Sequence, residues 1–413
     1  MDAPGNIAWG VTATALVLLM TPGVAFFYGG LVKAKSVVSM MMMSFGALGL
    51  VSVLWILYGF NMSAVESTWA FAGNPFSDFA LSGLATGESA NVDLIGVAFG
   101  ATFAIITVAL ISGAIADRAK FGSWMIFAGL FATLVYFPVA AWVWGGGWVY
   151  NLGETMFGAE SGVAVIDYAG GTAVHINAGA AALALALVLG KRIGFQKGIL
   201  KPHNVPLTLL GAALLWFGWF GFNAGAEWWA EDMGGVGLIA LNTLGATAAS
   251  VIGWITIEKI KDGKPTSVGA ASGAVAGLVA ITPACANLTP GWALLLGVLT
   301  GAVCALAIEL KFKLGFDDSL DVVGIHLVGG LIGTIYLGFF AIDTGLFLGG
   351  GPEQLIVQVI AAVGVLIYSF VVAFVLGFVI EKTMGFRIKN EDELAGVDTV
   401  VHGEEGYLLE ERV

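Results

Sequence analysis

A succession of long apolar runs is the feature that most constrains how this chain folds. An α-helix of about 20 residues crosses a hydrocarbon layer about 30 Å thick. In lipid it satisfies its own backbone hydrogen bonds, which an isolated strand does not. Eleven runs of suitable length lie near 7–31, 38–60, 92–116, 122–142, 169–189, 205–225, 234–257, 267–283, 291–310, 322–341 and 355–381. We therefore expect an all-α integral membrane protein with eleven transmembrane helices, among which the run at 267–283 is short and glycine-rich.

The composition agrees with a membrane protein. Of 413 residues, 58% are hydrophobic and only 11% are charged, whereas soluble proteins carry about 25% charged residues. The 60 glycines suit close helix packing in lipid. No basic segment precedes the run at 7–31, which is also too long for the apolar core of a signal peptide, so we expect a retained first helix. Cys285 and Cys304 are predicted to lie at different depths, without a disulfide framework.

The basic residues predict the orientation. If the N-terminus is outside, all 17 Lys and Arg residues fall on inner connections or the tail. They are Lys33, Lys35, Arg118, Lys120, Lys191, Arg192, Lys197, Lys201, Lys259, Lys261, Lys264, Lys311, Lys313, Lys382, Arg387, Lys389 and Arg412. Because basic residues favour the cytoplasmic side, we expect the N-terminus outside and the C-terminus inside. Acidic residues collect on the outer side, either because Lys and Arg are excluded there or as a negative mouth that concentrates cations.

The order of the runs predicts two related halves. Five runs at about 7–189 precede the basic loop at 190–204, and five follow it at about 205–341. An odd number of helices per half inverts one half relative to the other in the membrane. With a last helix at about 355–381, these form a membrane domain over 1–381. The polar segment 382–413 is predicted to be a cytoplasmic tail, for which disorder and docking are both open.

Two of the four histidines lie inside apolar runs. His175 is on the fifth run and His326 on the tenth, the last run of each half. An ionisable group within a membrane is costly and is by default a functional hypothesis; the competing interpretation is packing against a neighbouring backbone. A neutral pair sharing one N–H···N bond would accept and return protons without adding fixed charge. His203 in an inner loop and His402 in the tail are interpreted as ordinary solvated or capping groups.

Asp167 and a pair of phenylalanines stand near the predicted entrance. Asp167 is expected to cap the fifth helix, accepting from the N–H of Ala169 or Gly170, and its charge would also act on a passing cation from a distance. Phe99 and Phe103 are four residues apart and share one helix face. Aromatic faces attract cations by up to about 2 kcal/mol when desolvated, which favours a weak and selective entry site.

Dehydration limits what can cross. A bare cation in an apolar constriction loses far more than one aromatic contact returns. A solute that sheds its proton and crosses neutral avoids this cost, which ammonium or another small amine can do and potassium or sodium cannot.

The chain resembles the ammonium transporter family (Amt/Mep/Rh), and most closely its bacterial Amt branch. The similarity runs over essentially the whole length and is carried by ordered motifs. They are TPGVAFFYGGLVKAKS, FGATFAIITVALISGAIADR, VWGGGW, DYAGGTAVHINAG, KPHNVPLTLLG, GWFGFNAG, GKPTSVGAASGAVAGLVAITPAC, DVVGIHLVGG and GVDTVVHGEEGY.

The resemblance implies a homotrimer in the cell membrane with a conduction path for ammonium or ammonia, and possible passage of methylammonium, in each protomer. It assigns outer recruitment to Trp144, Phe99 and position Ala226, the gate to Phe103 and Phe222, and the proton relay to His175 and His326. Further pore lining is assigned to Val24, Tyr28, Leu215 and Val322. The tail resembles a regulatory segment that docks on the inner face and admits a PII-type signalling protein.

One position departs from the family pattern. Many members carry serine where this chain has Ala226, and that hydroxyl accepts a hydrogen bond from ammonium. We therefore expect weaker recruitment, carried mainly by Trp144 and the gate aromatics. The alternatives to uptake are an ammonium sensor and a passive channel for ammonia or carbon dioxide. No motif of an intramembrane enzyme accompanies Asp167, so we expect no enzymatic activity, cofactor, metal site or nucleic-acid partner.

Overall fold

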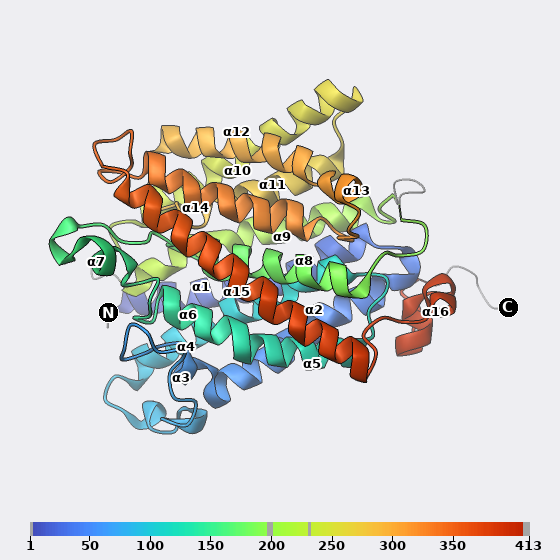
Figure 1. The fold of residues 1–413 in the computed structure, drawn as a ribbon, viewed down its shortest axis with the longest axis horizontal. Coiled ribbons are helices and arrows are strands. Elements are labelled where there is room, and N and C mark those ends of the chain that lie inside the picture. The colour runs from blue at the N-terminus through green and yellow to red at the C-terminus, as the bar shows by residue number, and fades with distance from the viewer. Residues whose placement is uncertain (1–2, 196–200, 230–232, 408–413) are drawn as a thin grey trace.

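The computed structural model is a bundle of helices that lie roughly side by side (Figure 1). It describes residues 3–195, 201–229 and 233–407; Lys197 and Arg412, both predicted on the inner side, lie outside the described residues. Throughout this part of the chain the regular elements are helical, apart from an isolated bridge between Ala119 and Arg387. The predicted all-α class is confirmed.

The helices of the first half follow the predicted runs. They are α1 (Pro4–Leu31), α2 (Val37–Leu54) with α3 (Phe60–Met62), α4 (Ala90–Ile111), α5 (Phe121–Phe131) with α6 (Phe137–Val143), and α8 (Asn177–Leu189). The helix pairs α2–α3 and α5–α6 are each joined by a π-helical turn, at Trp55–Gly59 and Ala132–Tyr136. Another π-helical turn, Gly171–Ile176, leads into α8, and the short α7 (Leu152–Phe157) lies in the connection before it.

The second half repeats this order. It contains α9 (Val205–Ala224), α10 (Val236–Asp262), α11 (Ser267–Ile281), α12 (Pro290–Ala307) and α14 (Val328–Phe340). The short α13 (Leu310–Leu314) follows α12, and a π-helical turn at Val323–Leu327 leads into α14. The chain ends with α15 (Glu353–Thr383) and the tail helix α16 (Asn390–Ala395).

Ten helices in the described ranges are long and apolar enough to cross a membrane. The eighth predicted span coincides with α11, which has only 15 residues and is therefore about 22 Å long. Twelve of its residues are buried. A Cβ on Gly277 would lie 2.5 Å from the Cβ of Ser250 on α10, so the glycines that shorten the apolar signal serve close packing.

The first helices of the two halves, α1 and α9, meet along a glycine seam. A Cβ on Gly211 would lie 2.1 Å from the backbone nitrogen of Phe27, and one on Gly221 would lie 2.8 Å from the carbonyl oxygen of Ala13. Only glycine permits such backbone approach. This contact brings residues from both halves to one central region.

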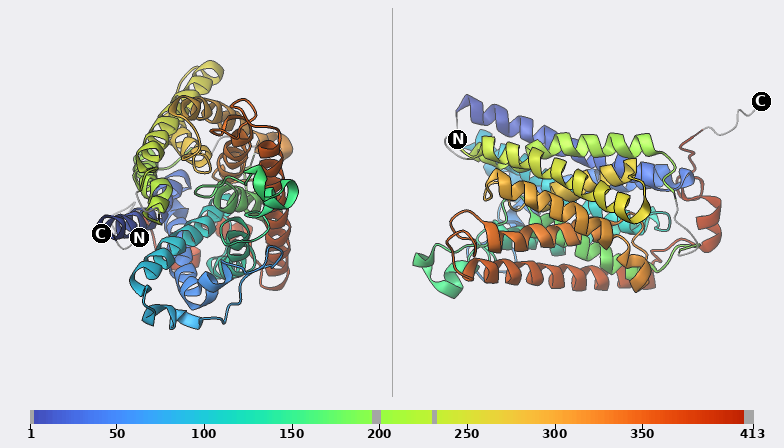
Figure 2. Two further views of the ribbon diagram at one scale, coloured as in Figure 1. Left: turned by 90° about the vertical axis from the view of Figure 1, so that its left-hand side faces the viewer. Right: turned by 90° about the horizontal axis from the view of Figure 1, so that it is seen from above.

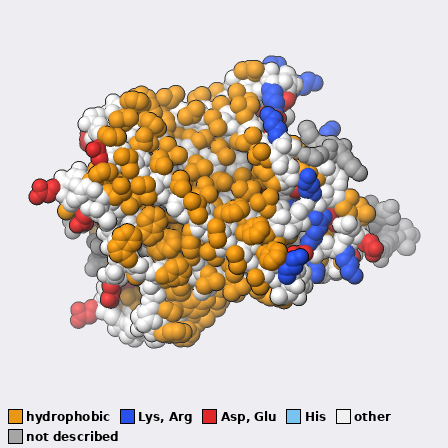
Figure 3. Space-filling view, viewed as in Figure 1, with side chains coloured by type: hydrophobic (Ala, Val, Ile, Leu, Met, Phe, Trp, Pro, Cys, Tyr) orange, Lys and Arg blue, Asp and Glu red, His pale blue; other side chains and the backbone are white. Residues whose placement is uncertain are grey.

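The surface is an apolar belt between two differently charged ends (Figure 3). Lys and Arg gather at the end where the tail lies, and most of the visible Asp and Glu lie at the end where α1 begins (Figures 1 and 3). Large apolar side chains are exposed, among them Phe217 and Ile252 at 59% and 60%. The predicted segregation of charge is present in the fold.

The tail docks on the basic end of the bundle, far from the N-terminus (Figure 2). The Asp398 carboxylate accepts hydrogen bonds from the N–H groups of Val38 and Ser39, at 3.0 and 2.7 Å, at the start of α2. Glu393 accepts from the N–H of Ile193 at 2.7 Å. Of the two alternatives for the tail, the structure therefore has the docked one up to residue 407.

Candidate functional site

A cavity of about 410 Å³ lies where α3, α6 and α9 end, at the end of the bundle where α1 begins. Its walls include four of the five predicted entry and gate residues, Phe99, Phe103, Trp144 and Ala226, together with Tyr168, which the sequence did not single out. Phe99 and Phe103 come from α4, and Ala226 follows α9. The cavity is mostly aromatic and apolar, so we call it the vestibule.

The wall of the vestibule at Phe103 is backed by a second, stacked ring. Phe103 and Phe222 have ring centroids 4.2 Å apart and planes inclined by 20°. Trp144 meets Phe103 edge-on at 6.1 Å, and Phe99 lies 5.0 Å from Phe103. Phe222 is fully buried. The stacked rings separate the vestibule from the centre of the bundle.

His175 and His326 face each other directly behind the stacked rings. Their Nδ1 atoms are 3.3 Å apart, and the side chains are 1% and 3% exposed. The His175 ring stacks on Trp219 at 5.5 Å and lies 6.1 Å from Phe222. Each histidine is in one of the π-helical turns that begin the last helix of each half. The structure thus brings together the two residues that the sequence had paired.

Asp167 holds the start of the His175 helix. Its carboxylate accepts from the N–H groups of Gly170, Gly171, Thr172 and Ala173 at 2.5–3.2 Å, and from the Thr172 hydroxyl. Of the two predicted donors, Gly170 bonds to it and Ala169 has no such bond, because the helix begins at Gly171. The Asp167 backbone oxygen accepts from Trp144 Nε1 at 2.9 Å, which ties the vestibule to this helix start.

Asp318 is the counterpart of Asp167 in the second half, and we did not predict it. It precedes His326 by the same interval of eight residues as Asp167 precedes His175. Its Oδ2 accepts from the N–H five residues later, that of Val323, at 2.7 Å, and it is 1% exposed. Burial is the main cause that raises the pKa of Asp318 to about 6. The repeated Asp–His spacing was the signal in the sequence.

The four residues predicted to line the path further in are all buried. Val24 and Val322 are 1% exposed, and Tyr28 and Leu215 are 2% exposed. Tyr28 and Val322 converge beside Gly113, where an added Cβ would lie 2.6 Å from the Tyr28 ring and 2.8 Å from the Val322 side chain. Leu215 packs against α1 at Gly23.

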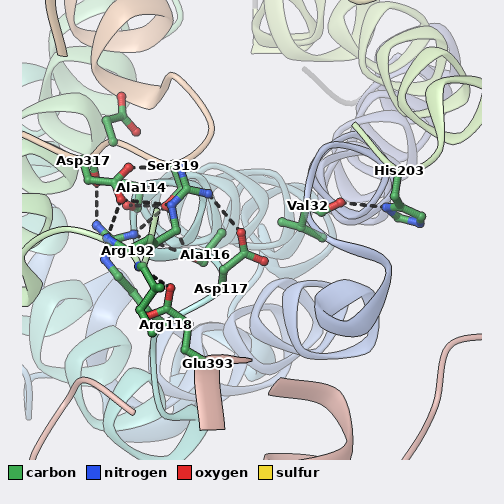
Figure 4. A network of polar contacts seen from close by, with 12 residues as sticks. Val32, Ala114, Ala116, Asp117, Arg118, Arg192, His203, Asp317, Ser319 and Glu393 are labelled. Atoms are coloured by element: carbon green, nitrogen blue, oxygen red, sulfur yellow. Dashed lines mark hydrogen bonds and ion pairs between the residues drawn. The ribbon is translucent and has the colours of Figure 1, made fainter. Parts of the chain in front are cut away.

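A buried charged cluster lies at the basic end (Figure 4). Arg192 bridges Asp117 at 2.9 Å and Asp317 at 3.0 Å. Arg118 is fully buried and donates to the carbonyl oxygen of Asp317 and to the Ser319 hydroxyl, each at 2.5 Å. Burial lowers the pKa of Arg118 to about 10. The cluster joins the connections α4–α5, α8–α9 and α13–α14 at the basic end and fixes the residues on both sides of Asp318.

Of the two interpretations of His203, solvated or capping, the structure has the capping one, because its ring contacts the carbonyl oxygen of Val32, the C-cap residue of α1. It is half-buried, with Nδ1 at 2.8 Å from the carbonyl oxygen of Val32 (Figure 4). Its Nε2 lies 2.9 Å from the hydroxyl of Tyr407. Tyr407 belongs to the docked tail, whose contact the local sequence around His203 does not reveal.

Comparison with known proteins identifies close relatives. Residues 8–407 match the Ammonium Transporter Family. An ammonium transporter of Mycobacterium tuberculosis (strain H37Rv) is 50% identical, and the match covers 98% of this chain and 90% of that protein. The ammonium transporter Amt1 of Archaeoglobus fulgidus is 41% identical over 98% of this chain and 99% of its own.

Solved structures share the fold. A protein described as a sensor Amt protein superposes with a TM-score of 0.87 and 27% identity, covering 96% of this chain and 97% of its own. Mep2 of Candida albicans gives a TM-score of 0.83 and 30% identity, with 94% and 87% covered. The family match across nearly the whole length and the identity of half the residues lead to one conclusion: the chain belongs to the ammonium transporter family.

Proposed function

We propose that this protein takes up ammonium across the cytoplasmic membrane by recruiting the ion in the vestibule and passing it on as ammonia. The observation that carries the proposal is the order of the parts along one line. The vestibule is followed by the stacked rings of Phe103 and Phe222, and these by the His175–His326 pair.

The vestibule suits a small cation. Trp144, Phe99 and Phe103 present aromatic groups there, which attract a cation without the tight ligation of a carboxylate. The nearby Asp167 carboxylate is already occupied by the start of its helix. It stabilises that helix and adds negative potential at a distance, without serving as a ligand.

The stacked rings and the histidines then select against ions that keep their charge. At a centroid separation of 4.2 Å, the rings admit nothing between them without a ring movement. Beyond them lie buried imidazoles among apolar side chains, a setting in which an intact ion is costly. Ammonium can give up its proton and cross as ammonia, whereas potassium cannot.

The histidine pair is placed to handle the proton. An N–H on one Nδ1 would donate to the other across 3.3 Å, and His175 Nε2 has no hydrogen-bond partner in the described part of the chain. A neutral pair of this kind donates and accepts by changing tautomers, without a fixed charge in the path. Tyr28, Val322, Val24 and Leu215 continue the lining.

The charge distribution supports the proposed orientation. The basic end with the docked tail would face the cytoplasm, and the acidic end with the vestibule would face outward, which places the N-terminus outside. The resemblance of the sequence to its family supports assembly as a homotrimer. The docked tail also favours a second role, in which its release or binding to a PII-type protein reports ammonium to the cell.

Flux into liposomes tests the proposal. We expect proteoliposomes to take up methylammonium and ammonium far faster than empty liposomes, and to take up potassium at the rate of empty liposomes. Replacement of Phe222 by alanine should open the path to potassium or lower selectivity for ammonium. Equal flux of potassium and ammonium through the parent protein would refute passage as ammonia.

A further inference from the structure

A hydrogen-bonded pair beside Ala226, Tyr168 with Glu227, has no role in the proposed function so far. Tyr168 lines the same cavity as Ala226. Its hydroxyl donates to Oε1 of Glu227, the residue directly after Ala226, at 2.5 Å. The two residues are 59 positions apart in the chain and come from different halves, so the fold alone brings them together.

The Glu227 carboxylate is fixed in this position. Its Oε2 accepts from the N–H of Gly235 at 3.0 Å. A Cβ on Gly235 would lie 2.8 Å from the Glu227 carboxyl carbon, so Gly235 lies tightly against the carboxylate. Each carboxylate oxygen of Glu227 therefore accepts one hydrogen bond. The carboxylate orients the phenol of Tyr168, and both of its oxygens are already occupied, so it does not hold a cation tightly.

The Tyr168 phenol keeps its proton, which it donates to Glu227, and its oxygen can accept a further hydrogen bond. Burial, followed by the hydrogen bond to Glu227, raises the pKa of Tyr168. A phenol that donates to a carboxylate forms a short, charge-assisted bond, and its oxygen gains negative charge while its lone pairs stay available. Such an oxygen beside position 226 accepts an N–H in the same way as a serine hydroxyl.

We propose that the Tyr168 hydroxyl, polarised by Glu227, is the hydrogen-bond acceptor for ammonium in the vestibule and supplies the contact that Ala226 lacks. This inference rests on the proposed function and deepens it by assigning a specificity-determining residue. It favours ions with N–H groups, because potassium has no proton to donate to the phenol. The carboxylate acts through the phenol, so the cation is held weakly enough to leave.

Kinetics of methylammonium uptake by the full-length protein in liposomes test the pair. We expect Tyr168→Phe and Glu227→Gln each to raise the half-saturating concentration about three- to tenfold, with the saturating rate unchanged. Because both act through one contact, the double variant should be no worse than Tyr168→Phe. Adding Ala226→Ser to Glu227→Gln should bring the half-saturating concentration back towards that of the parent, because the serine hydroxyl supplies an acceptor at the same place.

Glu154→Gln is the matched control, since Glu154 is an exposed acid of α7 at the same end of the bundle with the same change in charge. It should leave the half-saturating concentration unchanged. An equal rise in Glu154→Gln would mean that net negative charge is responsible and would overturn the inference. So would unchanged kinetics of Tyr168→Phe in a parent protein that transports normally. A parent that takes up no methylammonium would overturn the proposed function itself.

Discussion

Removal of the Asp167 carboxylate should destabilise the protein more than any other single substitution near the vestibule. The carboxylate is 7% exposed and accepts four backbone N–H groups at 2.5–3.2 Å. A hydrogen bond to a charged acceptor contributes about 1.5–3 kcal/mol. Since water and relaxation recover part of this, we expect Asp167→Ala to cost about 4 kcal/mol, which is at the upper end for point substitutions.

The assay is thermal unfolding of the purified protein in detergent, followed by tryptophan fluorescence. For a chain of this size, about 4 kcal/mol corresponds to a fall in Tm of at least about 5 °C. Asp167→Asn should lie between Asp167→Ala and the parent, because its oxygen keeps two donors while its NH2 group meets the other two.

Asp78 provides the control. It also accepts two backbone N–H groups, from Gly83 and Leu84 at 2.8 Å, but on a connecting loop, so Asp78→Ala should lower Tm clearly less. A Tm for Asp167→Ala equal to that of the parent would refute the reasoning that this buried carboxylate holds the helix start.

Two further predictions concern packing and pH. Gly211→Leu should reduce the yield of monodisperse protein in size-exclusion chromatography, because any Cβ there meets the backbone of Phe27. The control Gly237→Leu should not reduce the yield, because Gly237 has open space around it. Equal yields of the two variants would contradict the close α1–α9 contact. Asp318 binds its proton more tightly in the folded protein, where its pKa is about 6, than at the ordinary value of 3.8. As pH rises from about 4 to 7, the free energy of unfolding of the parent should therefore fall by up to about 3 kcal/mol relative to that of Asp318→Asn. Parallel Tm curves of parent and Asp318→Asn across that range would contradict the buried position of the carboxylate.

The helices were predictable because lipid imposes a length and an apolar composition on every crossing. The sequence placed α11 correctly, but the helix has 15 residues and ends at Ile281, before the predicted end at 283. Its glycines pack against α10 inside the bundle, and a short buried helix carries a weaker hydropathy signal than one that faces lipid.

The candidate site was predictable only in part. His175 and His326 lie on the last helix of each half, and this position predicted that they form a pair. The π-helical turns and the distance of 3.3 Å between their Nδ1 atoms depend on tertiary packing. Asp318 carried a signal in its spacing from His326, which equals the eight residues between Asp167 and His175. The bond between Tyr168 and Glu227 had none, because it joins two segments that are distant in the sequence.

Uptake by a histidine variant tests the central claim most directly. Methylammonium flux and potassium flux should be measured in proteoliposomes with the parent protein and with His175→Ala, after both are shown to have similar Tm values. If the facing imidazoles carry the proton in a dry path, the methylammonium flux of the variant should be about a hundredfold lower than that of the parent, or the variant should begin to pass potassium. Unchanged methylammonium flux with potassium still excluded would contradict the account.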